Sequence, residues 1–264
     1  MTTAIPALVL AGDRRGEADP VAARAGVRHK CLAPVAGIPM LCRVVENLAA
    51  VPRIGTIHVA LPDPALLEET PCLRDRLRAD RIRAADCAAS VSGSVADLFA
   101  RTGPPLLVTT ADHPLLTAAM IEVFLDLAAQ QPADLVAALV AEDTIRTVLP
   151  ATRRTFLRFR DGAFSGANLF LLAAPGTAAV LAFWRRVERE RKRPWRIARA
   201  LGPGLLLAYL LRRLTLERAM ERASDRIGGR ARAVVLPFAE AAVDVDRPAD
   251  LELAERLLRR REAA

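Results

Sequence analysis

The first 140 residues alternate short apolar runs with longer segments of helical spacing. This alternation predicts a parallel sheet covered by helices, because the crossover between two parallel strands usually contains a helix. Apolar runs of about four to eight residues are typical of strands buried in such a sheet. The expected strands are 5–11, 56–61, 82–85, 105–111 and 135–140.

Helical spacing marks the segments between these strands. Apolar side chains recur at helical intervals in 38–50, a charged helix is expected over 66–79, and a further helix is expected over 95–101. Thr117 is expected to cap a helix that ends near residue 130. A ligand site in a sheet of this kind lies at the carboxyl ends of the strands.

The pattern changes after residue 143. Three strands are expected at 144–149, 155–159 and 167–172. A helical stretch follows over 176–228, with breaks at Pro194 and at 202–204, then short strands at 233–236 and 242–245, and a closing helix at 249–260. Since no repeat or low-complexity linker is visible, we expect one domain over 1–264, with a helical insertion at about 176–228.

The charge of the chain favours anionic partners. Its net charge is +8, and most of the excess lies in 185–199, which contains eight Arg or Lys residues and only two acidic residues, Glu188 and Glu190. Phosphates, acidic lipid surfaces and nucleic acid would all fit this charge. Aromatic residues make up only 4% of the chain, and no nucleic-acid motif is present. We therefore expect no nucleic-acid partner.

Four cysteines occur without CxxC pairs or zinc-ligand spacing, which predicts free thiols in a reducing cytosol. The amino terminus has no basic-then-apolar signal pattern. The longest apolar run, 205–211, is too short to span a bilayer. We expect a cytoplasmic protein, with peripheral membrane contact left open.

A long polar segment separates the first expected strand from the first expected helix. About seventeen residues follow Gly12 before the chain turns apolar again after Lys30. A loop in this position can present backbone N–H groups to phosphates, and its arginines can neutralise phosphate charge. A solvated surface loop is the alternative. The segment matches neither GxxxxGK[ST] nor GxGxxG.

Carboxylates follow two of the expected strands. Asp112 ends an apolar run, where a carboxylate is poorly placed for packing but well placed to bind magnesium beside phosphates. Asp244 and Asp246 lie before the last helix, on the same side of the chain if it is extended. Either residue would then be able to meet Asp112. Alternatively Asp112 caps a helix, and Asp246 caps the last helix with Pro248 in its first turn.

Three segments together resemble the nucleotidyltransferase superfamily with a GT-A-like (Rossmann-like) fold. They are LVLAGDRRG…HKCLAPVAGIPML, VTTADHPLL and VDVDRPADLELA, and they come in the family's order. The subgroup that they resemble contains the molybdenum-cofactor nucleotidyltransferases and related NTP transferases. The resemblance implies a single three-layer α/β domain with a mostly parallel central sheet. It also implies a Mg²⁺-dependent reaction of an NTP with a phosphorylated acceptor that releases pyrophosphate.

The resemblance assigns roles by position. Arg15 would act on the triphosphate, and Lys30, in a K-x-L-x-P segment, would neutralise charge that develops during transfer. Asp112 would bind the metal, with Asp246 as second ligand and Asp244 in reserve. The implied nucleotide-binding residues are Leu10, Ala11, Gly12, Asp13, Gly16, Ser92, Gly93 and Ser94, and the implied acceptor-binding residues are Gly166 and Asn168.

Two features depart from the family pattern. Asp13 stands where the motif usually has glycine, and a carboxylate beside a triphosphate is unfavourable unless it turns outward or pairs with Arg14 or Arg15. The helical stretch is the second departure. Trp184 and Trp195 flank its basic run, and 205–211 is apolar all round. This stretch is either an amphipathic element that meets anionic lipid, or a helical cap or dimer contact buried in protein.

The resemblance therefore implies a nucleotidyltransferase that transfers a nucleoside monophosphate to a phosphorylated small-molecule or lipid-linked acceptor, and on family grounds alone CTP or GTP is the expected donor. A nucleotide-sugar glycosyltransferase of the same fold is one alternative, although its mid-chain DxD motif is replaced here by Asp112-His113-Pro114. A non-catalytic nucleotide-binding or membrane-associated regulator is another, for which Asp13 leaves room.

Overall fold

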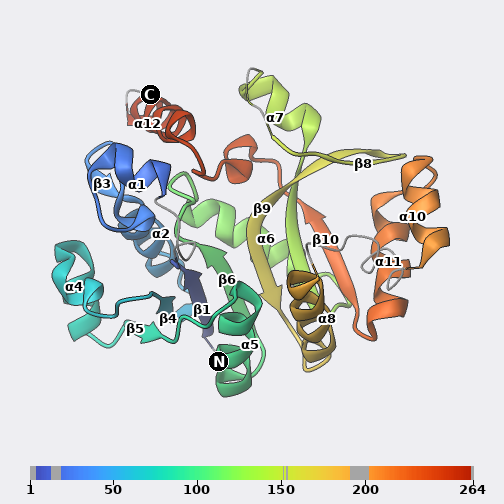
Figure 1. Cartoon of the computed structure of the whole chain (residues 1–264), viewed down its shortest axis with the longest axis horizontal. Helices are drawn as coiled ribbons and strands as arrows, with labels where there is room; N and C mark the ends of the chain where they lie inside the picture. The colour runs from blue at the N-terminus through green and yellow to red at the C-terminus, as the bar shows by residue number, and fades with distance from the viewer. Residues whose placement is uncertain (1–3, 13–18, 151, 153, 191–201, 263–264) are drawn as a thin grey trace. The chain divides into compact units, whose positions relative to one another are not determined.

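The structure, a computed structural model, describes residues 4–12, 19–150, 152, 154–190 and 202–262. It has the expected mixed α/β fold with a central, mostly parallel sheet (Figure 1). The chain divides into two compact units. One comprises Met1–Ser94, Leu107–Glu122 and Val243–Ala264, and the other Val95–Leu106 and Val123–Ala242. The single domain expected from the sequence stays a prediction.

The first unit is built on parallel strands in the order β6-β1-β4-β5. These are β1 (Ile5–Leu10), β4 (Ile54–Ala60), β5 (Ile82–Ala85) and β6 (Leu106–Thr110). The register sets Leu10 opposite both Ala60 and Thr110, so the carboxyl ends of three strands meet at one edge. All four strands were expected from their apolar runs.

Helices of this unit bury the predicted apolar faces. They include α2 (Met40–Ala49), α3 (Leu66–Glu69), α4 (Pro71–Arg78) and α12 (Pro248–Glu262), while α5 (Val91–Thr102) and α6 (Ala118–Ala129) begin here. The expected single helix over 66–79 is two helices. Pro71 begins the second one, because its ring is tolerated in a first turn but disrupts a helix interior.

The opening segment contains structure that the sequence reading missed. Asp19 caps α1 (Pro20–Ala25), its Oδ1 accepting from the N–H groups of Val21 at 2.8 Å and Ala22 at 3.1 Å. The chain continues through η1 (Lys30–Leu32), β2 (Pro34–Val35) and β3 (Ile38–Pro39). Asp19-Pro20 is a helix-start signal that we overlooked. Asp13, Arg15 and Gly16 lie outside the described residues.

The prediction of four free thiols is wrong for one pair. Cys42 of α2 and Cys72 of α4 form a disulfide, with their Cα atoms 6.2 Å apart, whereas Cys31 and Cys87 are not disulfide-bonded within the described part of the chain. Their separation of 30 residues carries no spacing signature, because the packing of two helices brings them together.

The second unit is centred on β7 (Leu135–Ala141). It pairs antiparallel with β9 (Gly162–Leu172) and parallel with β10 (Ala231–Val235), and β8 (Leu157–Phe159) forms a hairpin with β9. Helices α7 (Glu142–Val148), α8 (Thr177–Arg189), α10 (Pro203–Leu210) and α11 (Leu216–Ile227) and the 3-10 turn η2 (Ala239–Ala242) complete it (Figure 1).

Two expected strands are absent. The segment 144–149 lies mostly in α7, where Glu142 and Asp143 favour a helix start and the i,i+4 pair Glu142–Arg146 favours a helix. The segment 242–245 follows η2 and forms no strand. The stretch 176–228 is helical in its described parts, whereas Pro194 and Trp195 lie outside the described residues.

Asp134 is hydrogen-bonded both to residues that follow β9 and to the residue that precedes β10. Its Oδ2 accepts from the N–H of Arg230 at 2.7 Å, and its carbonyl accepts from Ala173 at 2.8 Å and from the hydroxyl of Thr177. A Cβ atom built on Gly176 would lie 2.5 Å from this carboxylate. Glycine is therefore needed at 176 for close approach.

We predict that Gly176→Ala lowers the free energy of unfolding by about 1–3 kcal/mol, since the methyl group must displace a carboxylate that is already bonded. The matched control is Gly204→Ala in α10, where an added Cβ meets nothing within 4 Å. That variant should be unchanged or more stable by up to about 1 kcal/mol. Urea denaturation of both measures the difference, and equal stabilities would contradict the packing argument.

Candidate active site

Lys30, Asp112 and Asp246 converge in the first unit. The Lys30 ammonium donates to Asp112 Oδ2 at 2.7 Å and to Asp246 Oδ1 at 3.0 Å. These partners are 82 and 216 positions away in the sequence. The side chains of Lys30 and Asp112 are only 17% and 19% exposed, whereas that of Asp246 is 51% exposed. One face of the cluster is thus open to solvent through Asp246.

Backbone bonds bring the three chain segments together. The N–H of Ala111 donates to the carbonyl of Leu10 at 2.9 Å, which extends the β1–β6 pairing to the residue before Asp112. The N–H of Val245 donates to the carbonyl of Asp112, also at 2.9 Å. The segment that precedes α12 is therefore fixed against the loop after β6, at the carboxyl edge of the strands.

The start of α12 leaves Asp246 available to Lys30. The Oδ2 atom of Asp250 accepts from the N–H groups of Asp246 at 3.2 Å and Arg247 at 3.0 Å, and Pro248 is the first helical residue. An acidic side chain at this position satisfies helix N–H groups from within the first turn, as in a capping box. Pro248 lies where we expected it, but Asp250 rather than Asp246 supplies the capping carboxylate.

Asp112 has one oxygen that fits a metal ligand. Its Oδ2 is bonded to Lys30, whereas its Oδ1 is buried and accepts no hydrogen bond from any described residue. Burying a carboxylate oxygen without a hydrogen-bond partner destabilises the folded state unless a ligand binds to that oxygen. Magnesium prefers carboxylate oxygens and commonly binds through one or two of them plus phosphates. The residues present therefore fit the cation that the fold family implies.

Both members of the buried pair are charged at neutral pH. Burial acts to lower the pKa of Lys30, but its attraction to Asp112 and its hydrogen bonds to Asp112 and Asp246 raise the pKa above 10.5. Burial acts to raise the pKa of Asp112, but the charge of Lys30 and its hydrogen bond hold the pKa below 3.8. The stabilisation from this pair is therefore present between those values. It is lost as pH falls through the lowered pKa or rises through the raised one.

The predicted nucleotide-binding residues at the end of β1 lie at the same edge. The N–H of Ala11 donates to the carbonyl of Ala60 at 3.0 Å, so the backbone of Leu10 and Ala11 is engaged within the sheet. Gly12 is exposed. A Cβ atom there would lie 3.1 Å from the sulfur of Cys87, which gives a steric reason for glycine at this position.

Ser92, Gly93 and Ser94 form the first turn of α5 rather than a loop before it. Ser90 caps the helix by accepting from the N–H of Gly93 at 3.1 Å. Both Ser92 and Ser94 are buried, and the Ser94 hydroxyl accepts from the N–H of Ala88 at 2.9 Å. This hydroxyl has a structural partner, and a role in binding a base stays a prediction.

Gly166 and Asn168 lie on β9 in the second unit. Asn168 has a φ of 47°, and the register of β7 with β9 shifts at this point, between the pairs Ala137–Phe170 and Leu139–Gly166. Such a bulge redirects side chains, and asparagine tolerates positive φ better than most residues. The bulge is therefore a physical reason for asparagine at this position, and a role in acceptor binding stays a prediction.

One residue that supports the candidate site, Arg261, could not be predicted from the sequence. Arg261, in the last turn of α12, donates from both Nη atoms to the carbonyl of Leu115 at 3.2 Å. It thereby holds the far side of the loop that carries Asp112. In the sequence it is one of three consecutive arginines, 259–261, and nothing there distinguishes it from its exposed neighbours.

Comparison with known proteins gives a family. The family model described as the MobA-like NTP transferase domain matches residues 7–231. A solved structure named as a hypothetical transferase from Thermus thermophilus is 33% identical, with a TM-score of 0.78, and the match covers 94% of this chain and 100% of that one. No curated protein matches.

Two further solved structures share the fold at low identity. One is a CMP:2-keto-3-deoxy-manno-octonic acid synthetase complexed with CTP, at 14% identity and a TM-score of 0.56, covering 99% of this chain and 100% of that one. The other is a 4-diphosphocytidyl-2C-methyl-D-erythritol synthase from Anaerococcus prevotii, at 10% identity and a TM-score of 0.55. The match covers 97% of this chain and 96% of that one.

The Thermus match also bears on the helical stretch 176–228. Because it leaves only 6% of this chain uncovered, most of that stretch has a counterpart there. The family match decides against a glycosyltransferase and against a non-catalytic regulator. This chain belongs to the MobA-like NTP transferase family and is a nucleotidyltransferase.

Proposed function

We propose that this nucleotidyltransferase transfers a nucleoside monophosphate from CTP or GTP, with Mg²⁺, to a phosphorylated acceptor that is a small molecule or lipid-linked, and releases pyrophosphate. The observation that carries the proposal is the ammonium of Lys30 held between Asp112 and Asp246 at the carboxyl edge of the strands. A cation beside acidic oxygens at such an edge is an arrangement suited to phosphoryl chemistry.

The proposed reaction is an in-line displacement. An oxygen of the acceptor phosphate forms a bond to the α-phosphorus of the NTP. The bond from that phosphorus to the α–β bridging oxygen breaks, and the electron pair leaves with pyrophosphate. No covalent enzyme intermediate is needed, so the enzyme contributes positioning and charge neutralisation.

Lys30 is the residue proposed to stabilise the developing charge. Its raised pKa keeps the ammonium protonated at neutral pH, and its two carboxylate partners fix its position before substrate binds. Charges that are positioned in advance stabilise a transition state without reorganising during the reaction. Arg15 is proposed to assist on the triphosphate, although it lies outside the described residues.

Asp112 and Asp246 are the residues that would hold Mg²⁺, with Asp244 in reserve. When bound, the ion would supply positive charge that neutralises the substrate phosphates. The fit rests on the buried Oδ1 of Asp112, which has no hydrogen-bond partner among the described residues. Asp246 is half exposed and so remains accessible to a ligand that arrives from solvent.

Support for the donor comes from the comparisons. The names of the two low-identity structures contain cytidine nucleotides, which favours CTP, while GTP is kept as a donor on the grounds of the MobA-like family alone. Cytoplasmic placement stays a prediction. The remaining substrate-contact predictions are Leu10, Ala11, Gly12, Asp13, Gly16, Ser92, Gly93 and Ser94 for the nucleotide, and Gly166 and Asn168 for the acceptor.

The proposal is tested by a thermal-shift screen of the four NTPs with and without Mg²⁺. A ligand that binds only the folded state raises the apparent stability. We expect CTP or GTP with Mg²⁺ to raise the melting temperature more than ATP or UTP, and the same nucleotide to support pyrophosphate release with phosphorylated acceptors. Stabilisation by ATP or UTP alone would contradict the donor assignment.

We predict that Lys30→Ala lowers kcat by about 100- to 1,000-fold, the range for loss of one positioned charge-stabilising group. Lys30→Arg keeps the charge but changes its geometry, so it should retain more stability than Lys30→Ala and still lose turnover. The control is Arg28→Ala, which removes only an exposed pair with Glu69. Wild-type turnover in both Lys30 variants would remove Lys30 from the mechanism.

Asp246 and Asp244 are distinguished by their metal dependence. We expect Asp246→Asn to raise the Mg²⁺ concentration needed for half-maximal activity by about ten-fold or more, because it removes one of two carboxylates in the cluster. Asp244→Asn is the matched variant and should shift this concentration much less. A titration of pyrophosphate release against Mg²⁺ measures both, and a larger shift for Asp244→Asn would reverse their roles.

A further inference from the structure

Helix α10 presents its most apolar face outward. Leu206, Leu207, Leu210 and Leu211 are 39%, 58%, 66% and 52% exposed. The other face, with Leu205, Ala208 and Tyr209, is half-buried. Amphipathic helices of water-soluble proteins place leucine inward and polar residues outward. Here four leucines form a contiguous exposed surface, which we call the leucine face, and patches of this kind mark interaction sites.

The second unit fixes the orientation of this helix. The hydroxyl of Tyr209 accepts from the N–H of Arg158 at 3.4 Å, and its ring meets Phe159 edge-on with centroids 5.4 Å apart. The N–H of Arg160 donates to the carbonyl of Leu214, just after α10, at 2.8 Å. The β8 strand thus holds the tyrosine side of α10, so the leucine face is the side left to solvent.

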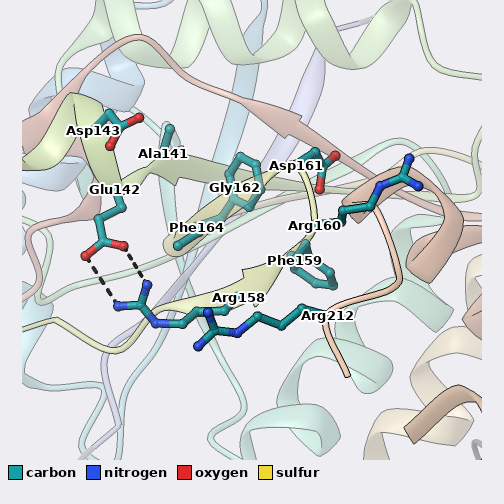
Figure 2. Close-up of a pocket in the computed structure, with 11 residues that line it drawn as sticks. Ala141, Glu142, Asp143, Arg158, Phe159, Arg160, Asp161, Gly162, Phe164 and Arg212 are labelled. Carbon is teal, nitrogen blue, oxygen red and sulfur yellow. Dashed lines mark hydrogen bonds and ion pairs between the residues drawn. The ribbon is translucent and has the colours of Figure 1, made fainter. Parts of the chain in front are cut away.

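Arginines surround the end of this helix. Arg212 and Arg213 follow α10 directly, and both are exposed. Arg212 lines a pocket of about 300 Å³ together with Arg158 and Arg160 (Figure 2). The guanidinium groups of Arg160, Arg212 and Arg213 form no ion pair with any described residue. They are positive charges at the edge of an apolar surface.

Two of the three acidic residues that line the pocket, Glu142 and Asp161, have partners other than Arg160 and Arg212. Glu142 forms ion pairs with Arg158 at 3.1 Å and with Arg146 at 2.7 Å. Asp161 accepts the N–H of Leu216 with both oxygens, at 3.0 and 3.2 Å, at the start of α11. Asp143 is the remaining acid of the lining. No Asp or Glu occurs in the sequence from Gly202 to Leu216.

We propose that the leucine face, with Arg212 and Arg213, docks this protein onto an anionic phospholipid surface. A short helix with an outward apolar face can bury its leucines at the headgroup boundary while adjacent arginines bind lipid phosphates. At eight residues α10 is about 12 Å long. None of the helices in the described ranges is long and apolar enough to cross a bilayer, so the contact is a surface one.

The charges favour lipid over other occupants. A second copy bound through the same face would add its own Arg212 and Arg213 to the contact, and no acidic residue occurs between Gly202 and Leu216 to pair with these charges. Nucleic acid would use the arginines but gain nothing from four leucines, since base stacking needs aromatic or guanidinium planes. Anionic lipid satisfies both parts of the surface, and the inference does not depend on the transferase proposal.

Co-sedimentation of the whole chain with phosphatidylcholine vesicles, with and without phosphatidylglycerol, tests the inference. We expect binding to the anionic vesicles that weakens with salt, and little binding to phosphatidylcholine alone. Leu207→Ser with Leu210→Ser should weaken anionic-vesicle binding roughly ten-fold or more. Arg212→Gln with Arg213→Gln should weaken it roughly thirty-fold.

Two matched controls isolate the surface. Val148→Ser with Val235→Ser removes two other exposed apolar side chains of the same unit. Arg259→Gln with Arg260→Gln removes two exposed charges from α12. Both should bind as the wild type does. The thermal melting curve of each variant without ligand shows that it is folded.

Absence of wild-type binding to anionic vesicles would overturn the proposal, as would equal losses in the variants and their controls. Light scattering after gel filtration tests the alternative that a second copy of this chain occupies the leucine face. If the leucine variant converts a dimer into a monomer and the wild type binds no vesicles, the face is a self-association surface and the proposal is wrong.

Discussion

The candidate active site depends on one ammonium group held between two carboxylates that are distant in sequence. Burying Lys30 and Asp112 removes both from water, and a buried charge is tolerated only when it is paired. The pairing compensates that cost and fixes the ammonium in position. The same carboxylates are the metal ligands that we propose, so the site has a single electrostatic centre on which substrate phosphates would converge.

The secondary structure around this centre leaves its charged groups available. Asp250 satisfies the start of α12, which leaves the carboxylate of Asp246 for Lys30. Val245 and Arg261 bond to the carbonyls of Asp112 and Leu115, so the loop after β6 is held by main-chain acceptors rather than by its carboxylate. The Oδ1 atom of Asp112 is thus left without a hydrogen-bond partner among the residues that the structure describes.

The sequence predicted that Lys30, Asp112 and Asp246 converge, and the structure brings them together, whereas it predicted their surroundings less well. Lys30, Asp112 and Asp246 stand in segments with recognisable spacing, and the apolar runs of the parallel strands are unambiguous. The capping role of Asp250 was missed because two acidic residues lie near the start of α12 and only geometry distinguishes them. The pattern of 144–149 predicts a strand rather than the observed helix, because Ile145, Val148 and Leu149 also suit an extended chain. The disulfide Cys42–Cys72 depends on tertiary packing alone.

A structure of the enzyme with CTP, Mn²⁺ in place of Mg²⁺ and no acceptor tests the central claim most directly, because the anomalous signal of the ion locates it without ambiguity. The account predicts the ion on Asp112 and Asp246, with the ammonium of Lys30 on a phosphate oxygen of the nucleotide. A nucleotide and ion bound elsewhere, with Lys30 still bonded to both carboxylates, would contradict it.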